Sequence, residues 1–244
     1  MAAARPLLLL TRPEASSEAF WSALPPEARD AVDVLINPLL SIHVTGPLPD
    51  LAGVAGVIFT SANAVEAYRF LGGQALRVPA FAVGPATGEA ARAIGFETHV
   101  AKGNADEVIA CVLRLCRRGP LLHLRGEAAI GDIANRLSAA GVETSDAVLY
   151  TQKLEPLSPA AREALSQDRP VLAPVFSPRT ARQLSRESMG LDHIRYAAIS
   201  RAVADALPDD AAGRTEIAQT PDRDGMVALV KDMITDAVLL ERRP

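Results

Sequence analysis

The sequence predicts an α/β fold of two flavodoxin-like, doubly wound parallel-sheet domains, one inserted in the other and joined by a two-stranded β-ladder. Short apolar runs alternate along the chain with longer segments in which apolar residues recur at helical spacing. This alternation is typical of parallel strands covered by helices. Weak internal repeats favour two related domains over a single large one.

The apolar runs are expected to form the strands, because each is short and is followed by a segment of different period. In chain order they are Leu7–Leu10, Val32–Ile36, Val54–Phe59, Ala80–Val83, Thr98–Ala101, Leu121–Leu124, Val148–Tyr150, Val171–Phe176, Ala197–Ile199 and Glu216–Ala218. Between them lie segments such as "SANAVEAYRFL", "PATGEAARAIG" and "DIANRLSAAG". The last two end at glycine, which favours the end of a helix.

Three pairs of segments resemble each other at similar offsets. "VIFTSANAVEAY" is similar to "PVFSPRTARQLS", and "AFAVGPATGEAARAIG" to "YAAISRAVADAL". "LLLLTRPEASSEAF" is similar to "LLHLRGEAAIGDIA". These matches pair Phe59 with Phe176, Gly84 with Ser200 and Leu10 with Leu124.

The order of the repeats predicts an insertion. The first unit opens the chain, yet its counterpart comes after the "FTSAN" and "VGPAT" units. We therefore expect an outer domain of residues 1–37 and 157–244 and an inserted domain of residues 47–145. The crossings, 38–46 and 146–156, read as an extended two-stranded hinge ladder, which is marginal alone and should let the domains open and close.

Composition narrows the classes of function. The 244 residues carry a net charge of −4 without a Lys/Arg block, so no nucleic-acid partner is expected. The run "PLLLLT" is too short for a membrane span, and no signal peptide is expected. The four histidines are scattered without ligand spacing, and the two cysteines are read as reduced thiols, so no metal site is expected.

Small polar side chains gather where strands give way to helices. The first turn of a helix has unbonded N–H groups and the positive end of the helix dipole, so it can bind an anion. Helix capping explains any one of these junctions alone, and that alternative stays open. The candidate groups are Thr60, Ser61 and Asn63; Gly84, Pro85 and Thr87; Ser177, Arg179 and Thr180; and, directly after strands, Arg12 and Arg125.

No familiar catalytic motif accompanies these junctions. The chain shows no P-loop, no GxGxxG after the first strand, no GxSxG and no Cys/His pair. The pattern favours a site that positions an already reactive anionic substrate, so that proximity and orientation supply most of the catalysis.

The motifs together resemble the uroporphyrinogen-III synthase family. The resemblance covers essentially the whole chain and is carried by "LLTRP", "IFTSANAV", "AVGPAT", "LRGE", "VLYTQ" and "FSPRTA" in this order. It implies two α/β domains around a cleft and a substrate with eight carboxylates, the linear tetrapyrrole hydroxymethylbilane. The family closes it to uroporphyrinogen III with inversion of ring D and loss of water, using no cofactor. Such a protein is a lyase of tetrapyrrole and heme biosynthesis and is expected to be a cytoplasmic monomer, with possible transient contact with the preceding pathway enzyme.

The resemblance also implies roles for single residues. Tyr150 in "VLYTQ" falls where the family has a tyrosine that assists departure of the hydroxyl; the alternative is a ring that packs on the hinge strands. Thr11 joins the residues above as a substrate contact. Where the family often has a hydroxyl-bearing helix start, this chain reads "ISRAVADAL", so either Ser200 and Arg201 or backbone amides alone would bind there.

Two other functions remain open at this point. A two-domain protein could close on a small anion without chemistry, since fold alone does not fix function. A sugar-phosphate isomerase would need a Glu or His base in the cleft, which no motif supplies.

Overall fold

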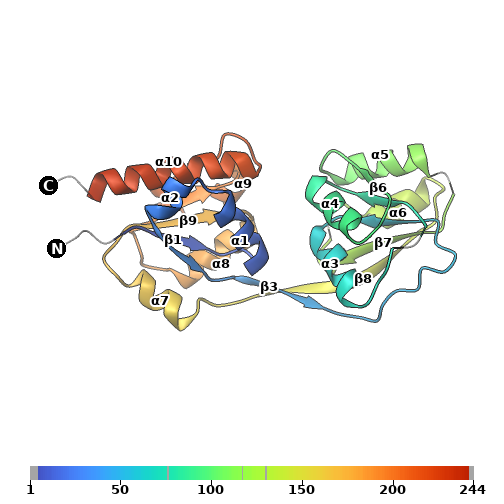
Figure 1. Ribbon diagram of the computed structural model, residues 1–244, viewed down its shortest axis with the longest axis horizontal. Helices are drawn as coiled ribbons and strands as arrows, with labels where there is room; N and C mark the ends of the chain where they lie inside the picture. Colours follow the sequence, from blue (N-terminus) through green and yellow to red (C-terminus); the bar gives the residue numbers. More distant parts are fainter. Residues whose placement is uncertain (1–4, 76, 117, 130, 242–244) are drawn as a thin grey trace. The chain divides into compact units, whose positions relative to one another are not determined.

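The computed structural model describes residues 5–75, 77–116, 118–129 and 131–241. It confirms the α/β class, with two mainly parallel sheets (Figure 1). The chain divides into two compact units, Met1–Ser41 with Leu154–Pro244 and Ile42–Lys153. The division falls inside the two segments that the sequence predicts as crossings. The predicted hinge motion stays a prediction.

The outer unit is a five-stranded parallel sheet in the order β11-β10-β9-β1-β2. This is the flavodoxin-like order that the sequence predicts. Its strands are β1 Leu7–Leu10, β2 Asp33–Ile36, β9 Val171–Val175, β10 Ile194–Ala198 and β11 Thr215–Ile217.

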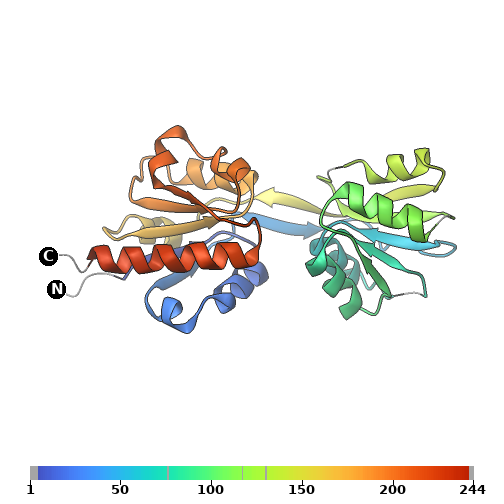
Figure 2. The same cartoon turned by 90° about the horizontal axis from the view of Figure 1, so that it is seen from above.

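Helices cover both faces of this sheet, as alternation along β1 requires. Leu7 and Leu9 pack in one apolar cluster, and Leu8 and Leu10 in the other. The first face carries α7 Pro159–Leu165, α8 Pro178–Glu187, α9 Arg201–Ala204 and the 3₁₀ helix Asp209–Arg214. The second carries α1 Glu14–Ala23, α2 Pro26–Asp30 and α10 Arg223–Glu241, and Figure 2 shows α10 running along the sheet.

The inserted unit holds a six-stranded sheet in the order β3-β8-β7-β4-β5-β6. Its strands are β3 Leu40–Val44, β4 Gly56–Phe59, β5 Ala80–Ala82, β6 Thr98–Val100, β7 Leu121–Gly126 and β8 Thr144–Leu154. α3 Ala62–Phe70 and α4 Pro85–Ala93 pack on one face, and α5 Ala105–Leu115 and α6 Ile133–Ala139 on the other. β3 runs antiparallel to β8: Thr45 N donates to Leu149 O at 2.8 Å and Glu155 N to Leu39 O at 3.0 Å.

The two sheets have the same spatial order with a permuted chain order. In the inserted unit β8, β7, β4, β5 and β6 stand where the outer unit has β2, β1, β9, β10 and β11. The repeats in the sequence therefore reflect related units. The permutation also explains why the counterpart of the first segment comes late in the chain.

Two of the predicted repeat registers are wrong by one residue. Ser61 and Ser177 occupy the same N-cap position, which makes Val175 rather than Phe176 the counterpart of Phe59. The pairing of β1 with β9, and of β7 with β4, makes His123 rather than Leu124 the counterpart of Leu10. A one-residue slip exchanges the two faces of a strand, so this correction matters for the site. The match of Gly84 with Ser200 holds, since both cap helices.

Three strands are longer than the sequence predicts, because polar residues interrupt or follow their apolar runs. β7 continues past Leu124 through Arg125 and Gly126. β8 begins at Thr144, and its residues from Ser145 to Val148 are exposed or partly exposed, whereas the apolar run covers only Val148–Tyr150. β10 begins at Ile194, before the expected Ala197, and its Arg195 is tolerated because it pairs with Glu216 on β11 at 2.8 Å. None of the described helices is long and apolar enough to cross a membrane.

Candidate functional site

In the inserted unit the junction after β4 is not a simple helix cap. Ser61 is the N-cap of α3, but its side chain makes no capping hydrogen bond. Its hydroxyl instead lies 3.0 Å from the phenol oxygen of Tyr150. Thr60, Ser61 and Asn63 are all partly exposed. Capping therefore does not explain Ser61, which leaves the side chain available for another role.

Tyr150 combines the two alternatives that the sequence left open. Its ring is 6% exposed and belongs to the apolar cluster under α3 and α4. Gly126, its partner on β7, leaves room for the ring, since an added Cβ would lie 2.5 Å from Tyr150 Cζ. The hydroxyl nevertheless reaches the start of α3 through Ser61. The ring is a packed side chain, and its polar end belongs to the junction.

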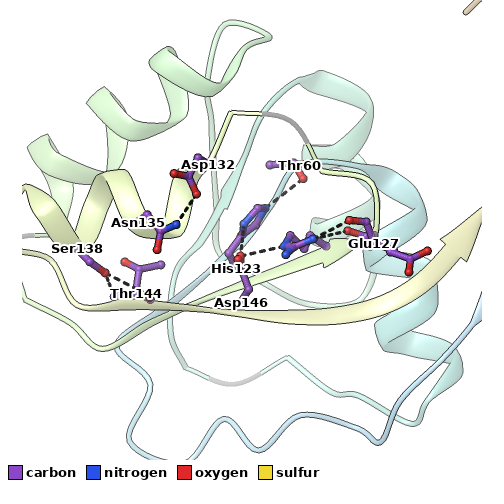
Figure 3. A network of polar contacts seen from close by, with 10 residues as sticks. Thr60, His123, Glu127, Asp132, Asn135, Ser138, Thr144 and Asp146 are labelled. Carbon is purple, nitrogen blue, oxygen red and sulfur yellow. Dashed lines mark hydrogen bonds and ion pairs between the residues drawn. The ribbon is translucent and has the colours of Figure 1, made fainter.

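A chain of polar groups runs behind Thr60 (Figure 3). Thr60 Oγ1 lies 3.2 Å from His123 Nε2, and His123 Nδ1 lies 2.8 Å from Asp146 Oδ1. His123 is in the middle of β7 and is 2% exposed. Burial lowers the pKa of His123; Asp146 opposes this effect, and Arg125 adds to it. The sequence analysis missed both His123 and Asp146. The signal was a histidine within the apolar strand "LLHL".

Arg125 is largely occupied within its own unit. Its Nε lies 3.1 Å from Asp146 Oδ1. One terminal nitrogen donates to Gly126 O at 2.9 Å and to Glu127 O at 3.0 Å. These acceptors leave few free donors for a ligand carboxylate, so the structure gives the proposed substrate role of Arg125 little support.

The junction after β5 has little side-chain chemistry of its own. Gly84 is the N-cap of α4, and Pro85 occupies the first turn. Thr87 is 6% exposed. An anion here would meet backbone N–H groups more than side chains.

In the outer unit, Arg12 is the side chain best placed for a carboxylate. Its guanidinium lies over the ring of Phe176, 4.4 Å from the centroid. Burial lowers its pKa, and the nearby Arg223 lowers it further. No carboxylate in the described part of the chain pairs with it. Thr11, next to it, is 1% exposed, and its hydroxyl has no hydrogen-bond partner among the described residues.

At the start of α8 the capping alternative holds. Ser177 Oγ accepts from Thr180 N at 3.1 Å and lies 2.9 Å from Thr180 Oγ1. Arg179 in the same turn is exposed. At α9, Ser200 is an N-cap whose side chain makes no capping bond, and the exposed Arg201 is 3.9 Å from Asp205. Helix α9 has only four residues, so its dipole contributes little.

The structure thus brings the predicted residues together within each unit in two small groups, Thr60 with Ser61 and Tyr150, and Ser177 with Thr180. The expectation that all of them share one cleft stays a prediction. Among the described residues, no group of His, Cys, Asp and Glu could hold a metal ion.

Comparison with known proteins agrees with the family resemblance found in the sequence. The family model "Uroporphyrinogen-III synthase HemD" matches residues 27–228. A crystal structure of uroporphyrinogen-III synthetase from Helicobacter pylori is 17% identical, with a TM-score of 0.65 over 94% of this chain and 99% of that one. A mutant uroporphyrinogen III synthase from the extremely thermophilic bacterium Thermus thermophilus is 17% identical, with a TM-score of 0.54 over 96% and 100%. At this identity the two likenesses show the fold. No curated protein matched the chain.

Proposed function

Because the chain belongs to the uroporphyrinogen-III synthase family, we propose that it converts hydroxymethylbilane to uroporphyrinogen III. The match over residues 27–228 is the observation that carries this proposal. The reaction closes the linear tetrapyrrole, inverts ring D and releases water, which makes the enzyme a hydro-lyase of tetrapyrrole biosynthesis. We further propose that it works in the cytoplasm as a monomer, with at most transient contact with the enzyme that supplies its substrate.

The proposed reaction needs assistance at one atom, the oxygen of the hydroxymethyl group that departs. The hydroxymethyl group must leave as water, which gives an azafulvene; the substituted carbon of ring D then attacks, through a spiro intermediate, before the macrocycle closes again. A phenol can hydrogen-bond the departing hydroxyl, although phenols in general are weak acids. Tyr150 is the candidate for this role, because its hydroxyl lies at the start of α3 and is held by Ser61 at 3.0 Å.

Several uncharged hydrogen-bond donors would bind the substrate together. Eight carboxylates on a flexible chain would be costly to hold with eight buried ammonium groups, whereas helix-start amides and exposed hydroxyls bind them with little desolvation. Arg12 adds a cation whose donors have no carboxylate partner in the described chain. The remaining substrate contacts are proposed at Thr11, Asn63, Gly84, Pro85, Thr87, Ser177, Arg179, Thr180, Ser200 and Arg201, while Arg125 would act chiefly by holding Asp146.

The test is the isomer composition of the product. Purified protein is mixed with freshly prepared hydroxymethylbilane, and the products are oxidised and separated into type I and type III uroporphyrins. The enzyme should raise the type III fraction in proportion to its concentration, because closure without it gives type I. A type III fraction equal to that of a sample without protein would overturn the proposal. Binding without type III product would instead identify the anion-binding protein considered from the sequence, which no comparison favours.

A further inference from the structure

The polar chain behind Thr60 is not needed to build the fold. The corrected equivalence of the two units places Leu10, Ile36 and Phe176 of the outer unit where the inserted unit has His123, Asp146 and Thr60. Those three residues pack in an apolar cluster under α1, α2 and α10. The same strand positions are therefore stable with apolar side chains alone. A buried polar side chain such as His123, which is 2% exposed, is costly unless it is satisfied by hydrogen bonds, so the presence of this polar chain in only one unit points to a role beyond packing.

Donor and acceptor chemistry determines which atoms carry the protons in the polar chain of Thr60, His123 and Asp146. A carboxylate only accepts hydrogen bonds, so His123 Nδ1 donates to Asp146 Oδ1 across 2.8 Å. Arg125 Nε forms an ion pair with the same oxygen at 3.1 Å, which keeps the carboxylate in place. Since burial lowers the pKa of His123, the ring is neutral near pH 7, and its second nitrogen Nε2 must be an acceptor. Its partner at 3.2 Å is the Thr60 hydroxyl, which therefore donates inward.

A threonine hydroxyl has only one proton to give. With that proton directed at His123, the oxygen of the partly exposed Thr60 can still accept a hydrogen bond but cannot donate one to a substrate carboxylate. A carboxylate oxygen placed there would face a lone pair. The neighbouring Ser61 is different, because in its 3.0 Å contact with Tyr150 either oxygen can be the donor.

We infer that the Asp146–His123 pair holds the Thr60 hydroxyl as a hydrogen-bond acceptor, so that Thr60 binds an N–H donor of the substrate, a pyrrole N–H, rather than one of its carboxylates. The inference rests on the proposed function for the identity of the substrate. Thr60 is the substrate contact, and His123 and Asp146 are positioning residues that act through it. This replaces the carboxylate contact that the sequence predicts for Thr60.

The first experiment reads the proton positions directly and needs no substrate. The full-length protein is labelled with ¹⁵N-histidine, and the His123 signals are assigned by their loss in His123→Gln. Wild-type His123 should carry its proton on Nδ1 and none on Nε2. Asp146→Asn can keep an acceptor oxygen toward Nδ1 and should preserve this pattern, whereas Asp146→Ala should not. A wild-type ring protonated on Nε2 would overturn the inference.

The second experiment measures KM and kcat for hydroxymethylbilane. Thr60→Val should raise KM about two- to tenfold, the effect of one lost hydrogen bond, with a smaller change in kcat, and Thr60→Ser should restore it. His123→Phe frees the Thr60 proton and should also raise KM. If Thr60 met a carboxylate, the freed proton would lower KM instead, and that result would overturn the inference, as would an unchanged KM in Thr60→Val.

A matched control separates this effect from loss of an ion pair. Asp106 on α5 pairs with Arg136 on α6 at 2.6 Å in the same unit, and this ion pair is separate from the contacts that join Asp146, His123 and Thr60. Asp106→Ala should leave both the KM and the His123 signals unchanged, whereas Asp146→Ala should alter both. A wild-type protein that forms no type III product would refute the proposed function, while the histidine signals would still report on the proton arrangement.

Discussion

Replacement of Tyr150 by phenylalanine separates the two roles of this side chain. The ring, 6% exposed, keeps its packing against Gly126, so only the 3.0 Å hydrogen bond to Ser61 is lost. Ser61 is partly exposed and can bond water instead, so the free energy of unfolding should fall by about 0.5–1 kcal/mol, toward the lower end for one hydrogen bond. In a chain of this size that is a decrease in Tm of about 1–4 °C. The variant should fold.

The expected effect on catalysis is larger. If the phenol assists departure of the hydroxyl, kcat should fall about tenfold or more, which corresponds to about 1.4 kcal/mol or more of transition-state stabilisation. The assay is the initial rate of type III product at saturating hydroxymethylbilane, together with thermal unfolding of the same preparations.

The chain offers a matched control for this substitution. Tyr68 is also buried in the inserted unit, at 3% exposure, and its hydroxyl donates to Gln74 O at 2.9 Å. Tyr68→Phe removes one hydrogen bond at a position with no proposed contact with substrate. It should lower stability by a similar amount and leave kcat unchanged. A Tyr150→Phe enzyme with wild-type kcat would show that Tyr150 only packs, and equal losses of kcat in both variants would show that the effect is general destabilisation.

Three further outcomes are expected. Gly126→Ala would put a Cβ 2.5 Å from Tyr150 Cζ, so it should displace the ring and lower both Tm and kcat, with a larger decrease in Tm than Tyr150→Phe causes. Because burial lowers the pKa of folded His123, the unfolded chain binds its proton more readily; the stability that neutral His123 provides is present above its ordinary pKa of 6.5 and is lost as pH falls below it. Urea unfolding between about pH 8 and pH 5 should therefore show a steeper loss in wild type than in His123→Gln, and parallel curves would contradict this. Arg12→Lys keeps the charge but loses the planar stacking on Phe176 and the paired donors, so KM should rise about tenfold or less with kcat nearly unchanged; an unaltered KM would remove Arg12 from the substrate contacts.

Much of the fold is readable from the sequence because it depends on local pattern. The alternation of apolar runs and helical segments predicts both sheets, and the small residues Ser61, Gly84, Ser177 and Ser200 all occupy helix N-cap positions in the structure. Strand length is less predictable where polar residues face solvent or each other, as in β8. The capping alternative could not be decided in advance, because whether a serine caps its helix depends on a rotamer. The Ser177 side chain makes the capping hydrogen bond, and the Ser61 side chain does not.

The site depends on strand pairing, which the sequence does not contain. Asp146 lies 23 residues after His123, and the two meet only because β7 and β8 pair in the register that sets them side by side. A shift of one residue in that register would turn one of them to the opposite face. The same reasoning explains why the internal repeat is detectable while its predicted register is wrong by one: apolar residues match apolar residues on either face.

The corrected register makes Arg12 and Arg125 equivalent positions of the two related units. Their surroundings differ, so we expect the two guanidinium groups to have different roles. Arg125 has a carboxylate beside it, Asp146 at 3.1 Å, and two carbonyl acceptors, so its charge is already balanced. Arg12 has an aromatic ring and a second arginine near it, and no partner carboxylate among the described residues. A half-buried guanidinium next to a like charge is unfavourable until an anion arrives, so a substrate carboxylate would bind there with the cost of burial already met by the fold. In the proposed function, Arg12 would therefore be the cationic contact of the outer unit. In the proposed function the inserted unit, whose arginine is paired with Asp146, would offer the hydroxyls of Thr60 and Ser61 instead.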